Sequence, residues 1–309
     1  MKPYSPNHAP GLKNLVLASR RQACCRRLGL TGMASLTAAV VLATLTACGG
    51  GGGSTSVTTL SASGLRFGGN MVVTVNGAGL DDPGLQMRVV GPCADVVRST
   101  GPSDSQTTFS CRLTGVGQIE PVIRTGTGSV LASIKVTVPT PQISMTLTQG
   151  DRVGTMVIEL DPNAASETAK NFLDYLSTDF YRNTIFHRVV NGKLAQGGGY
   201  TSGPTPKPAT LAPIALQSDR GLNNLRGTIA MARTNAFNSA TSQFYFNVSD
   251  NPEFDFMGPD LPGYAVFGRI ISGLNVLDEL GRVPTQIVDN EFPALPLQQI
   301  VITAISQLR

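Results

Sequence analysis

The chain has 309 residues, of which 14% are charged, 34 are glycine and 20 are proline, a composition that excludes a coiled coil and a charge-rich disordered protein. The net charge of +4 comes from residues 1–47, which hold six basic residues and no acidic one, leaving 18 basic against 20 acidic residues elsewhere. A nucleic-acid partner is therefore not expected. The only histidines are His8 and His187, so the sequence predicts no metal site, no histidine-dependent triad and no cofactor.

The N-terminal segment has the order of an export signal. Arg26-Arg27 precede an apolar run that ends in Leu45-Thr46-Ala47-Cys48. This ending resembles the lipobox of bacterial lipoproteins, which implies a signal peptide over residues 1–47, cleavage before Cys48 and lipidation of Cys48. The alternative is a transmembrane helix, because the run is about 20 residues long.

Five consecutive glycines, Gly49–Gly53, favour the lipoprotein interpretation, because they cannot continue a helix but suit a tether over residues 48–54. The resemblance implies a protein exported to the bacterial envelope. We expect the outer membrane, facing the periplasm, with the lipid as the only membrane anchor.

Two cysteines lie beyond the signal and Cys48, namely Cys93 and Cys111. An even pair in an oxidising compartment predicts a disulfide, which would stabilise the fold by about 3 kcal/mol when it closes a loop of this length. The alternative is two free buried thiols.

Residues 55–140 contain short segments of alternating polarity separated by turn residues. The predicted strands are 71–76, 85–90, 108–113, 118–124 and 130–138. This spacing predicts a small β-sandwich, which looks like a bacterial Ig-like module. It contains no catalytic constellation, so we expect a spacer or a module that binds an unknown envelope protein. Pro139-Thr140-Pro141 marks its boundary with a second domain over residues 142–309.

The second domain opens with a predicted hairpin of strands 145–148 and 154–160. Asp161-Pro162 predicts the start of a helix, since Asp suits an N-cap and Pro suits the first turn. Its apolar residues recur with helical spacing and predict one buried face: Ala165, Ala169, Phe172, Leu173 and Leu176. The proline-containing stretch 200–217 is predicted to be a loop.

Four blocks of sequence follow in order: Phe186-His187-Arg188 with Gln196-Gly197-Gly198, then residues 227–233 (GTIAMAR), residues 242–245 (SQFY) and residues 264–268 (YAVFG). Their order and spacing resemble the cyclophilin family of peptidyl-prolyl cis-trans isomerases. The resemblance covers residues 142–309. It implies a mainly β fold, a closed antiparallel barrel of eight strands with two helices, the second over residues 274–280 with Leu274, Leu277 and Leu280 inward.

The resemblance also implies the roles of individual residues. Arg188 would donate to the prolyl nitrogen, and Gln196 would hold the substrate backbone and orient Arg188. Residues Ala232, Arg233 and Thr234 would form a strand that pairs with the substrate main chain. The walls of the proline pocket would be Leu194, Tyr245 and Phe254. Tyr264, where many members of the family carry His, would also bind the substrate, whereas His187 would be a scaffold residue. Lys193 and Glu253 depart from the family pattern, because aromatic residues are expected at their positions.

Three functions are compatible with this sequence. The first is a peptidyl-prolyl isomerase that acts on proline-containing polypeptides and assists the folding of exported proteins. The second is a peptide-binding module or chaperone of the same fold with little turnover, an alternative motivated by Lys193 and Glu253. The third is a structural envelope lipoprotein in which the Ig-like module carries the function.

Overall fold

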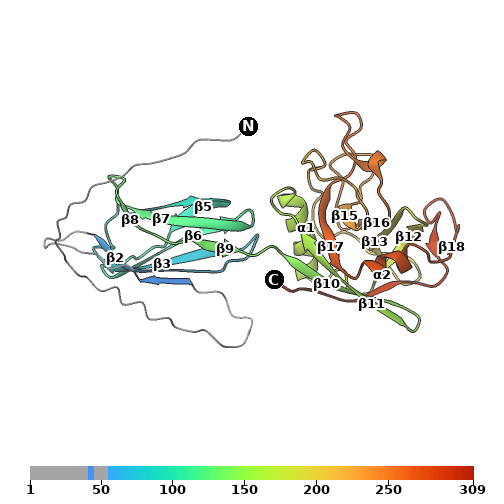
Figure 1. The fold of residues 1–309 in the computed structure, drawn as a ribbon, viewed down its shortest axis with the longest axis horizontal. Coiled ribbons are helices and arrows are strands. Elements are labelled where there is room, and N and C mark those ends of the chain that lie inside the picture. The colour runs from blue at the N-terminus through green and yellow to red at the C-terminus, as the bar shows by residue number, and fades with distance from the viewer. Residues whose placement is uncertain (1–40, 45–54) are drawn as a thin grey trace, which may run out of the picture. The chain divides into compact units, whose positions relative to one another are not determined.

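The computed structural model describes residues 41–44 and 55–309, and it is mainly β (Figure 1). Cys48 and most of the predicted signal peptide lie outside the described residues. Four residues of that predicted segment form strand β1 (Val41–Thr44), which pairs antiparallel with β2 (Ser56–Ser63). Among the described residues, neither helix is long and apolar enough to cross a membrane.

Residues 55–138 form two antiparallel sheets. One has the order β1-β2-β3-β6-β5, and in the other β7 pairs with β4, β8 and β9. The remaining bounds are β3 Asn70–Ala78, β4 Gln86–Val90, β5 Cys93–Arg98, β6 Gln106–Leu113, β7 Gly117–Arg124, β8 Val130–Ser133 and β9 Val136–Val138. The predicted single strand over 130–138 is wrong. The chain breaks at Ile134-Lys135, and the two halves pair with different parts of β7.

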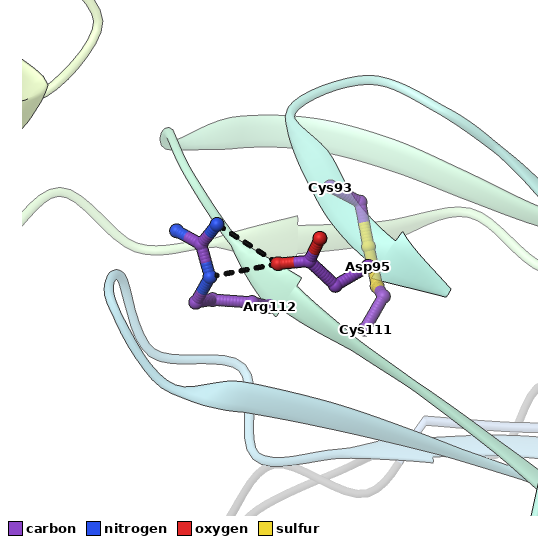
Figure 2. Close-up of a disulfide and its surroundings, with 4 residues drawn as sticks. All are labelled: Cys93, Asp95, Cys111 and Arg112. Carbon is purple, nitrogen blue, oxygen red and sulfur yellow. Dashed lines mark hydrogen bonds and ion pairs between the residues drawn. A yellow bond between two sulfur atoms is a disulfide. The ribbon is translucent and has the colours of Figure 1, made fainter. Parts of the chain in front are cut away.

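Strands β2 and β5 were missed by the sequence pattern. In β5 the residues Asp95, Val96 and Val97 are exposed, so no apolar alternation marks the strand. Cys93 on β5 and Cys111 on β6 are joined by a disulfide, with their Cα atoms 5.9 Å apart. Beside it, the guanidinium of Arg112 donates to the carboxylate of Asp95 over 2.9 and 3.1 Å (Figure 2).

Residues 142–309 form the closed barrel that the resemblance implies. Eight strands follow one another in the order β12-β20-β10-β11-β17-β15-β16-β13, and pairing of β13 with β12 closes the ring. Their bounds are β10 Gln142–Gln149, β11 Arg152–Leu160, β12 Thr184–Val190, β13 Leu194–Thr201, β15 Thr228–Met231, β16 Phe244–Asn247, β17 Val266–Ser272 and β20 Val301–Gln307. Short pieces are β14 Thr205–Pro206, η1 Pro252–Phe254, β18 Thr285–Gln286 and β19 Leu295–Pro296. The hairpin predicted around Gly150-Asp151 is β10–β11.

Two helices accompany the barrel (Figure 1), and each differs from its prediction at one point. Helix α1 (Ser166–Ser177) begins later than expected, because Asp161 closes a turn first, with its Oδ1 accepting the N–H of Ala164 over 3.2 Å. Helix α2 (Leu274–Leu280) has the predicted bounds and buries Leu277 and Leu280. Leu274, however, is 37% exposed, so the prediction that it points inward is wrong.

The barrel interior is filled with aromatic rings contributed by both helix and strands. The ring of Phe172 on α1 lies 4.8 Å from that of Tyr181 and 5.5 Å from that of Phe244 on β16. The Tyr181 hydroxyl donates to the carbonyl oxygen of Ser242 over 2.9 Å, so the polar atom of this buried side chain has a hydrogen-bond partner. These contacts tie α1 to β16, one of the strands that carry the site.

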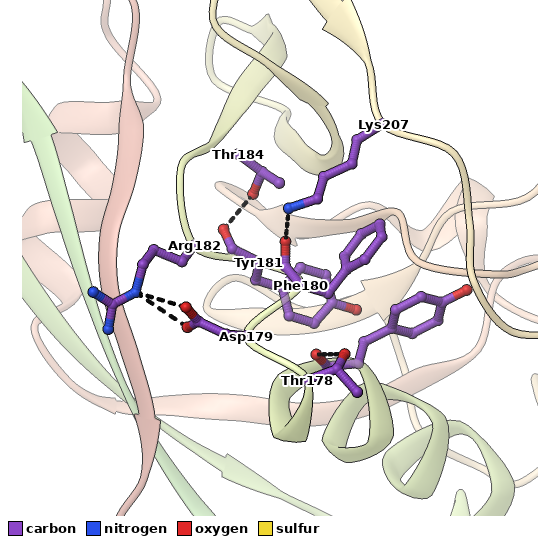
Figure 3. Close-up of polar contacts among 8 residues, drawn as sticks. Thr178, Asp179, Phe180, Tyr181, Arg182, Thr184 and Lys207 are labelled. Atoms are coloured by element: carbon purple, nitrogen blue, oxygen red, sulfur yellow. Dashed lines mark hydrogen bonds and ion pairs between the residues drawn. The ribbon is translucent and has the colours of Figure 1, made fainter.

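The turn between α1 and β12 positions the Phe-His-Arg motif. Thr184 Oγ1 donates to the carbonyl oxygen of Tyr181 over 2.7 Å, and Lys207 Nζ donates to that of Phe180 (Figure 3). Asp179 adopts a left-handed backbone with φ 56° and pairs with Arg182 over 3.0 Å. These contacts hold the backbone of the turn in place directly before strand β12 begins.

Candidate active site

The sheet register places five residues, beginning with Arg188, in one row across the barrel wall. Arg188 on β12 is directly opposite Gln196 on β13, which is opposite Tyr245 on β16. Tyr245 is in turn opposite Ala230 on β15, which is opposite Val266 on β17. Because directly opposed residues of an antiparallel sheet share a face, these five side chains lie on the same surface of the wall.

A register shift in β12 decides that Arg188 belongs to this face. Phe186 is opposite Gly197, whereas Arg188 is opposite the adjacent residue Gln196, so His187 is the extra residue of a bulge. Without the bulge, Phe186 and Arg188 would share a face. With it, Phe186 is buried in the barrel core and Arg188 is half-buried on the outer face.

Three polar side chains are linked on this face. Arg188 Nη1 donates to Gln196 Oε1 over 3.3 Å, and Gln196 Nε2 donates to Gln243 Oε1 over 2.9 Å. The guanidinium of Arg188 is thereby oriented by one acceptor, and the acceptor is itself held by a third side chain. Gln243 did not figure among the predicted site residues, although it lies within the SQFY block.

A small group of apolar residues adjoins this row, and we call it the apolar cluster. Leu194, Ala230, Tyr245 and Val266 form its buried part, with Ala232, Phe254 and Tyr264 packed against them. The rings of Tyr245, Phe254 and Tyr264 meet edge to face, with centroids 5.4 to 5.9 Å apart. Hence the structure brings together the three predicted pocket walls, Leu194, Tyr245 and Phe254, with Tyr264, which was also predicted to bind the substrate.

Lys193 lies at the edge of the apolar cluster as part of an ion pair. Its Nζ is 2.6 Å from Glu253 Oε1 and 4.9 Å from the centroid of the Phe254 ring. The hydrogen bond from Lys193 lowers the pKa of Glu253. The two residues that depart from the family pattern are therefore partners.

The segment Ala232–Thr234 is not a strand, which corrects the prediction, because β15 ends at Met231. The N–H of Ala232 donates to the carbonyl oxygen of Gln243, and that of Thr234 donates to Ser239 Oγ, both over 2.9 Å. The pairing of these residues with a substrate main chain stays a prediction. The Arg233 guanidinium lies 4.7 Å from the Tyr264 ring, at the other end of the aromatic group from Lys193.

His187 is buried, as expected for a scaffold residue, with its ring centroid 4.4 Å from that of Tyr200. Its Nδ1 has no hydrogen-bond partner among the described residues. Burial lowers the pKa of His187 to about 4, so the imidazole is neutral near pH 7.

Comparison with known proteins shows which family residues 144–306 resemble. The family described as cyclophilin type peptidyl-prolyl cis-trans isomerase/CLD matches residues 144–306, more than half of the chain. Peptidyl-prolyl cis-trans isomerase A of Dickeya dadantii is 46% identical over 149 residues, which cover 48% of this chain and 77% of that protein. Peptidyl-prolyl cis-trans isomerase B of Escherichia coli is 49% identical over 134 residues, covering 43% of this chain and 81% of that protein.

A solved structure is also similar. The crystal structure of a cyclophilin type peptidyl-prolyl cis-trans isomerase from Cryptosporidium parvum aligns with 55% of this chain and 99% of its own, at 23% identity and a TM-score of 0.44.

Proposed function

The chain belongs to the cyclophilin-type peptidyl-prolyl cis-trans isomerase family, and from this premise we propose that Arg188 is the residue that catalyses rotation about X-Pro bonds of polypeptides. The enzyme class follows from the family, and the proposal concerns which residues of this chain perform the reaction. The substrates of the proposed reaction are proline-containing polypeptides.

The chemistry needs a fixed hydrogen-bond donor rather than an acid or a base. Rotation about an X-Pro bond has a barrier of roughly 18–20 kcal/mol, because the C–N bond is partly double. At 90° of rotation the resonance is lost and a lone pair develops on the prolyl nitrogen. A donor directed at that nitrogen binds the twisted state better than either planar state, which is the condition for catalysis.

The observation that carries the proposal is the position of Arg188 in the row beside the apolar cluster. Its guanidinium is oriented by Gln196, and Gln196 is directly opposite Tyr245 in the sheet. A proline ring held by Leu194, Tyr245, Phe254 and Tyr264 would present its nitrogen toward this row. Arginine suits the role because it stays charged and carries several donors in a rigid plane.

The test is two-dimensional NMR exchange on a short Ala-Pro peptide with wild type and Arg188→Ala. We expect the variant to lose at least about tenfold in turnover, by analogy with the loss of one preorganised donor. Arg269→Ala is the matched control, because Arg269 is an exposed arginine on β17 whose guanidinium lies 3.8 Å from the carboxylate of Glu159. Unchanged turnover in Arg188→Ala contradicts the assigned role.

A second candidate, a peptide-binding module with little turnover, is favoured by one contact. The Lys193–Glu253 ion pair places two charges beside Phe254, at the edge of the apolar cluster. Peptide affinity without measurable exchange in the wild type would support this candidate over the enzyme.

The cellular site is a separate proposal, which rests on the sequence of residues 26–53. We propose that the protein is exported, lipidated on Cys48 and anchored in the bacterial envelope, where it assists the folding of exported proteins. Residues 55–140 would then be an Ig-like spacer or a module for an envelope partner. Labelling with a radioactive fatty acid tests the anchor: wild type should incorporate label and Cys48→Ala should not.

A further inference from the structure

Three buried asparagines form a continuous chain of side-chain amides behind the apolar cluster. Asn224, Asn247 and Asn251 are each at most 3% exposed. Asn251 Nδ2 donates to Asn247 Oδ1 over 2.7 Å, and Asn247 Nδ2 donates to Asn224 Oδ1 over 3.1 Å. We call these residues the asparagine chain. A buried amide without a hydrogen-bond partner destabilises a fold, and in the asparagine chain each side chain bonds at least one of the others.

At one end of the asparagine chain, Asn224 links Tyr245 to Phe254, two residues of the apolar cluster. The Tyr245 hydroxyl donates to Asn224 Oδ1 over 2.8 Å, and Asn224 Nδ2 donates to the carbonyl oxygen of Phe254 over 2.9 Å. The N–H of Asn224 also donates to Asp255 Oδ1 over 2.6 Å. Burial raises the pKa of Tyr245 well above its usual range, so its hydroxyl stays a donor.

At the other end of the asparagine chain, Asn251 bonds Lys193, the residue that precedes Leu194 of the apolar cluster. Asn251 Nδ2 donates to the carbonyl oxygen of Lys193 over 3.0 Å, and the N–H of Asn251 donates to the carbonyl oxygen of Asn224 over 2.8 Å. Lys193 is followed directly by Leu194, the first residue of β13. The asparagine chain therefore links Phe254, Tyr245 and the start of β13 through main-chain and side-chain atoms.

We propose that the asparagine chain positions the walls of the proline-binding surface and thereby sets the affinity for the X-Pro substrate. This inference rests on the proposed function. Within the part of the chain that the structure describes, no side-chain hydrogen bond of Asn224, Asn247 or Asn251 involves Arg188, Gln196 or Gln243. These asparagines are positioning residues, because they act through Phe254, Tyr245 and Lys193. Loosening the walls should therefore weaken binding while the donor that acts on the twisted bond keeps its orientation.

The decisive measurement separates KM from kcat in the peptide exchange assay. We expect Asn224→Ala to raise KM about fivefold, with kcat within about twofold of wild type, because only uniform binding is lost. Asn251→Ala leaves the carbonyl oxygen of Lys193 with the N–H of Val248 as its remaining donor and should act in the same direction. An unchanged KM in both variants overturns the inference.

A matched control separates positioning from loss of stability. Asn171 on α1 is also buried and donates to the carbonyl oxygen of Thr241 over 2.7 Å, outside the asparagine chain. Asn171→Ala should lower the melting temperature while leaving KM unchanged. If it raises KM as much as Asn224→Ala does, the KM effect reflects general destabilisation and the inference is wrong.

Two further measurements keep the inference testable if a variant does not fold or if turnover is absent. Tyr245→Phe removes only the hydroxyl and should raise KM about twofold, because Asn224 keeps its bond from Asn247. An NMR titration gives the peptide Kd without turnover, and Asn224→Ala should weaken it about fivefold. Peptide binding without exchange in the wild type contradicts the enzymatic proposal alone, whereas no binding in the wild type overturns both.

Discussion

Lys193 donates to Glu253 across the edge of the apolar cluster, with Nζ 2.6 Å from Oε1, while the same ammonium lies 4.9 Å from the centroid of the Phe254 ring. The pair unites the two positions at which this chain departs from the family pattern. A long alkyl stem can cover apolar surface while its charged end stays in water. In this chain it is the ammonium of Lys193 that lies against the Phe254 ring, at a position where the resemblance implies an aromatic residue.

The first prediction concerns this substitution. Lys193→Phe should lower KM for a proline peptide about threefold, because an aromatic ring buries more apolar area beside Phe254 than the lysine stem does. Steady-state peptide exchange measures it. Lys193→Met, which keeps an unbranched stem without the charge, is the control and should fall between wild type and Lys193→Phe. A higher KM in Lys193→Phe contradicts the placement of residue 193 at the pocket wall.

The second prediction concerns the orientation of Arg188. Gln196→Ala removes the acceptor of Arg188 Nη1, so we expect kcat to fall about tenfold with a smaller change in KM. Gln196→Glu keeps an acceptor for Arg188 and should retain more activity than Gln196→Ala. Gln142→Ala, at a half-buried amide that donates to Glu159 on β11, is the control for loss of a glutamine. Equal kcat in wild type and Gln196→Ala contradicts the orienting role.

The third prediction concerns pH. Burial lowers the pKa of His187 from 6.5 to about 4, so the unfolded chain binds a proton in a pH range where the folded chain does not. The stability that this neutral imidazole contributes is complete above pH 6.5 and is lost as the pH falls toward 4, to a limit of about 3 kcal/mol.

Urea unfolding at pH 7.5 and pH 5 measures this loss, and His187→Phe should show a smaller difference between the two. The NMR signal of the imidazole, assigned by its absence in His187→Phe, should not titrate above pH 5. A midpoint near 6.5 contradicts the burial assigned to His187.

The fourth prediction concerns the disulfide. Replacing Cys93 and Cys111 by serine should lower the free energy of unfolding of residues 55–138 by about 3 kcal/mol, because the loop between them is no longer closed in the unfolded chain. Urea unfolding followed by the amide NMR signals of this region measures it.

Asp95→Asn is the control for that variant, because it removes the charge that pairs with Arg112, keeps a residue type that tolerates the left-handed backbone at this position (φ 57°) and should cost less than about 1 kcal/mol. Peptide exchange at 25 °C should stay at the wild-type rate in both variants. A loss of exchange in the cysteine variant contradicts the assignment of catalysis to residues 142–309 alone.

Much of the fold could be predicted because its signals are local. The strands of the β10–β11 hairpin and the helical spacing in α1 follow from consecutive residues. The bounds of α2, by contrast, were implied by the resemblance to the family. The errors also have local causes. Strand β5 was missed because its middle residues are exposed. Residues 130–138 were predicted as one strand because alternation alone does not reveal that β8 and β9 pair with different parts of β7.

The sequence by itself determined the family, through blocks such as Phe186-His187-Arg188 and Gln196-Gly197-Gly198, and with it the proposal that Arg188 and Gln196 act on the substrate. Only the tertiary structure decided on which face Arg188 lies. Strand periodicity puts Phe186 and Arg188 together, and the bulge at His187 separates them into core and site. Likewise, the contact of Lys193 with Glu253 and the asparagine chain join residues up to 60 positions apart. Such pairings depend on register and chain closure, which are set by the cooperative packing of all eight strands.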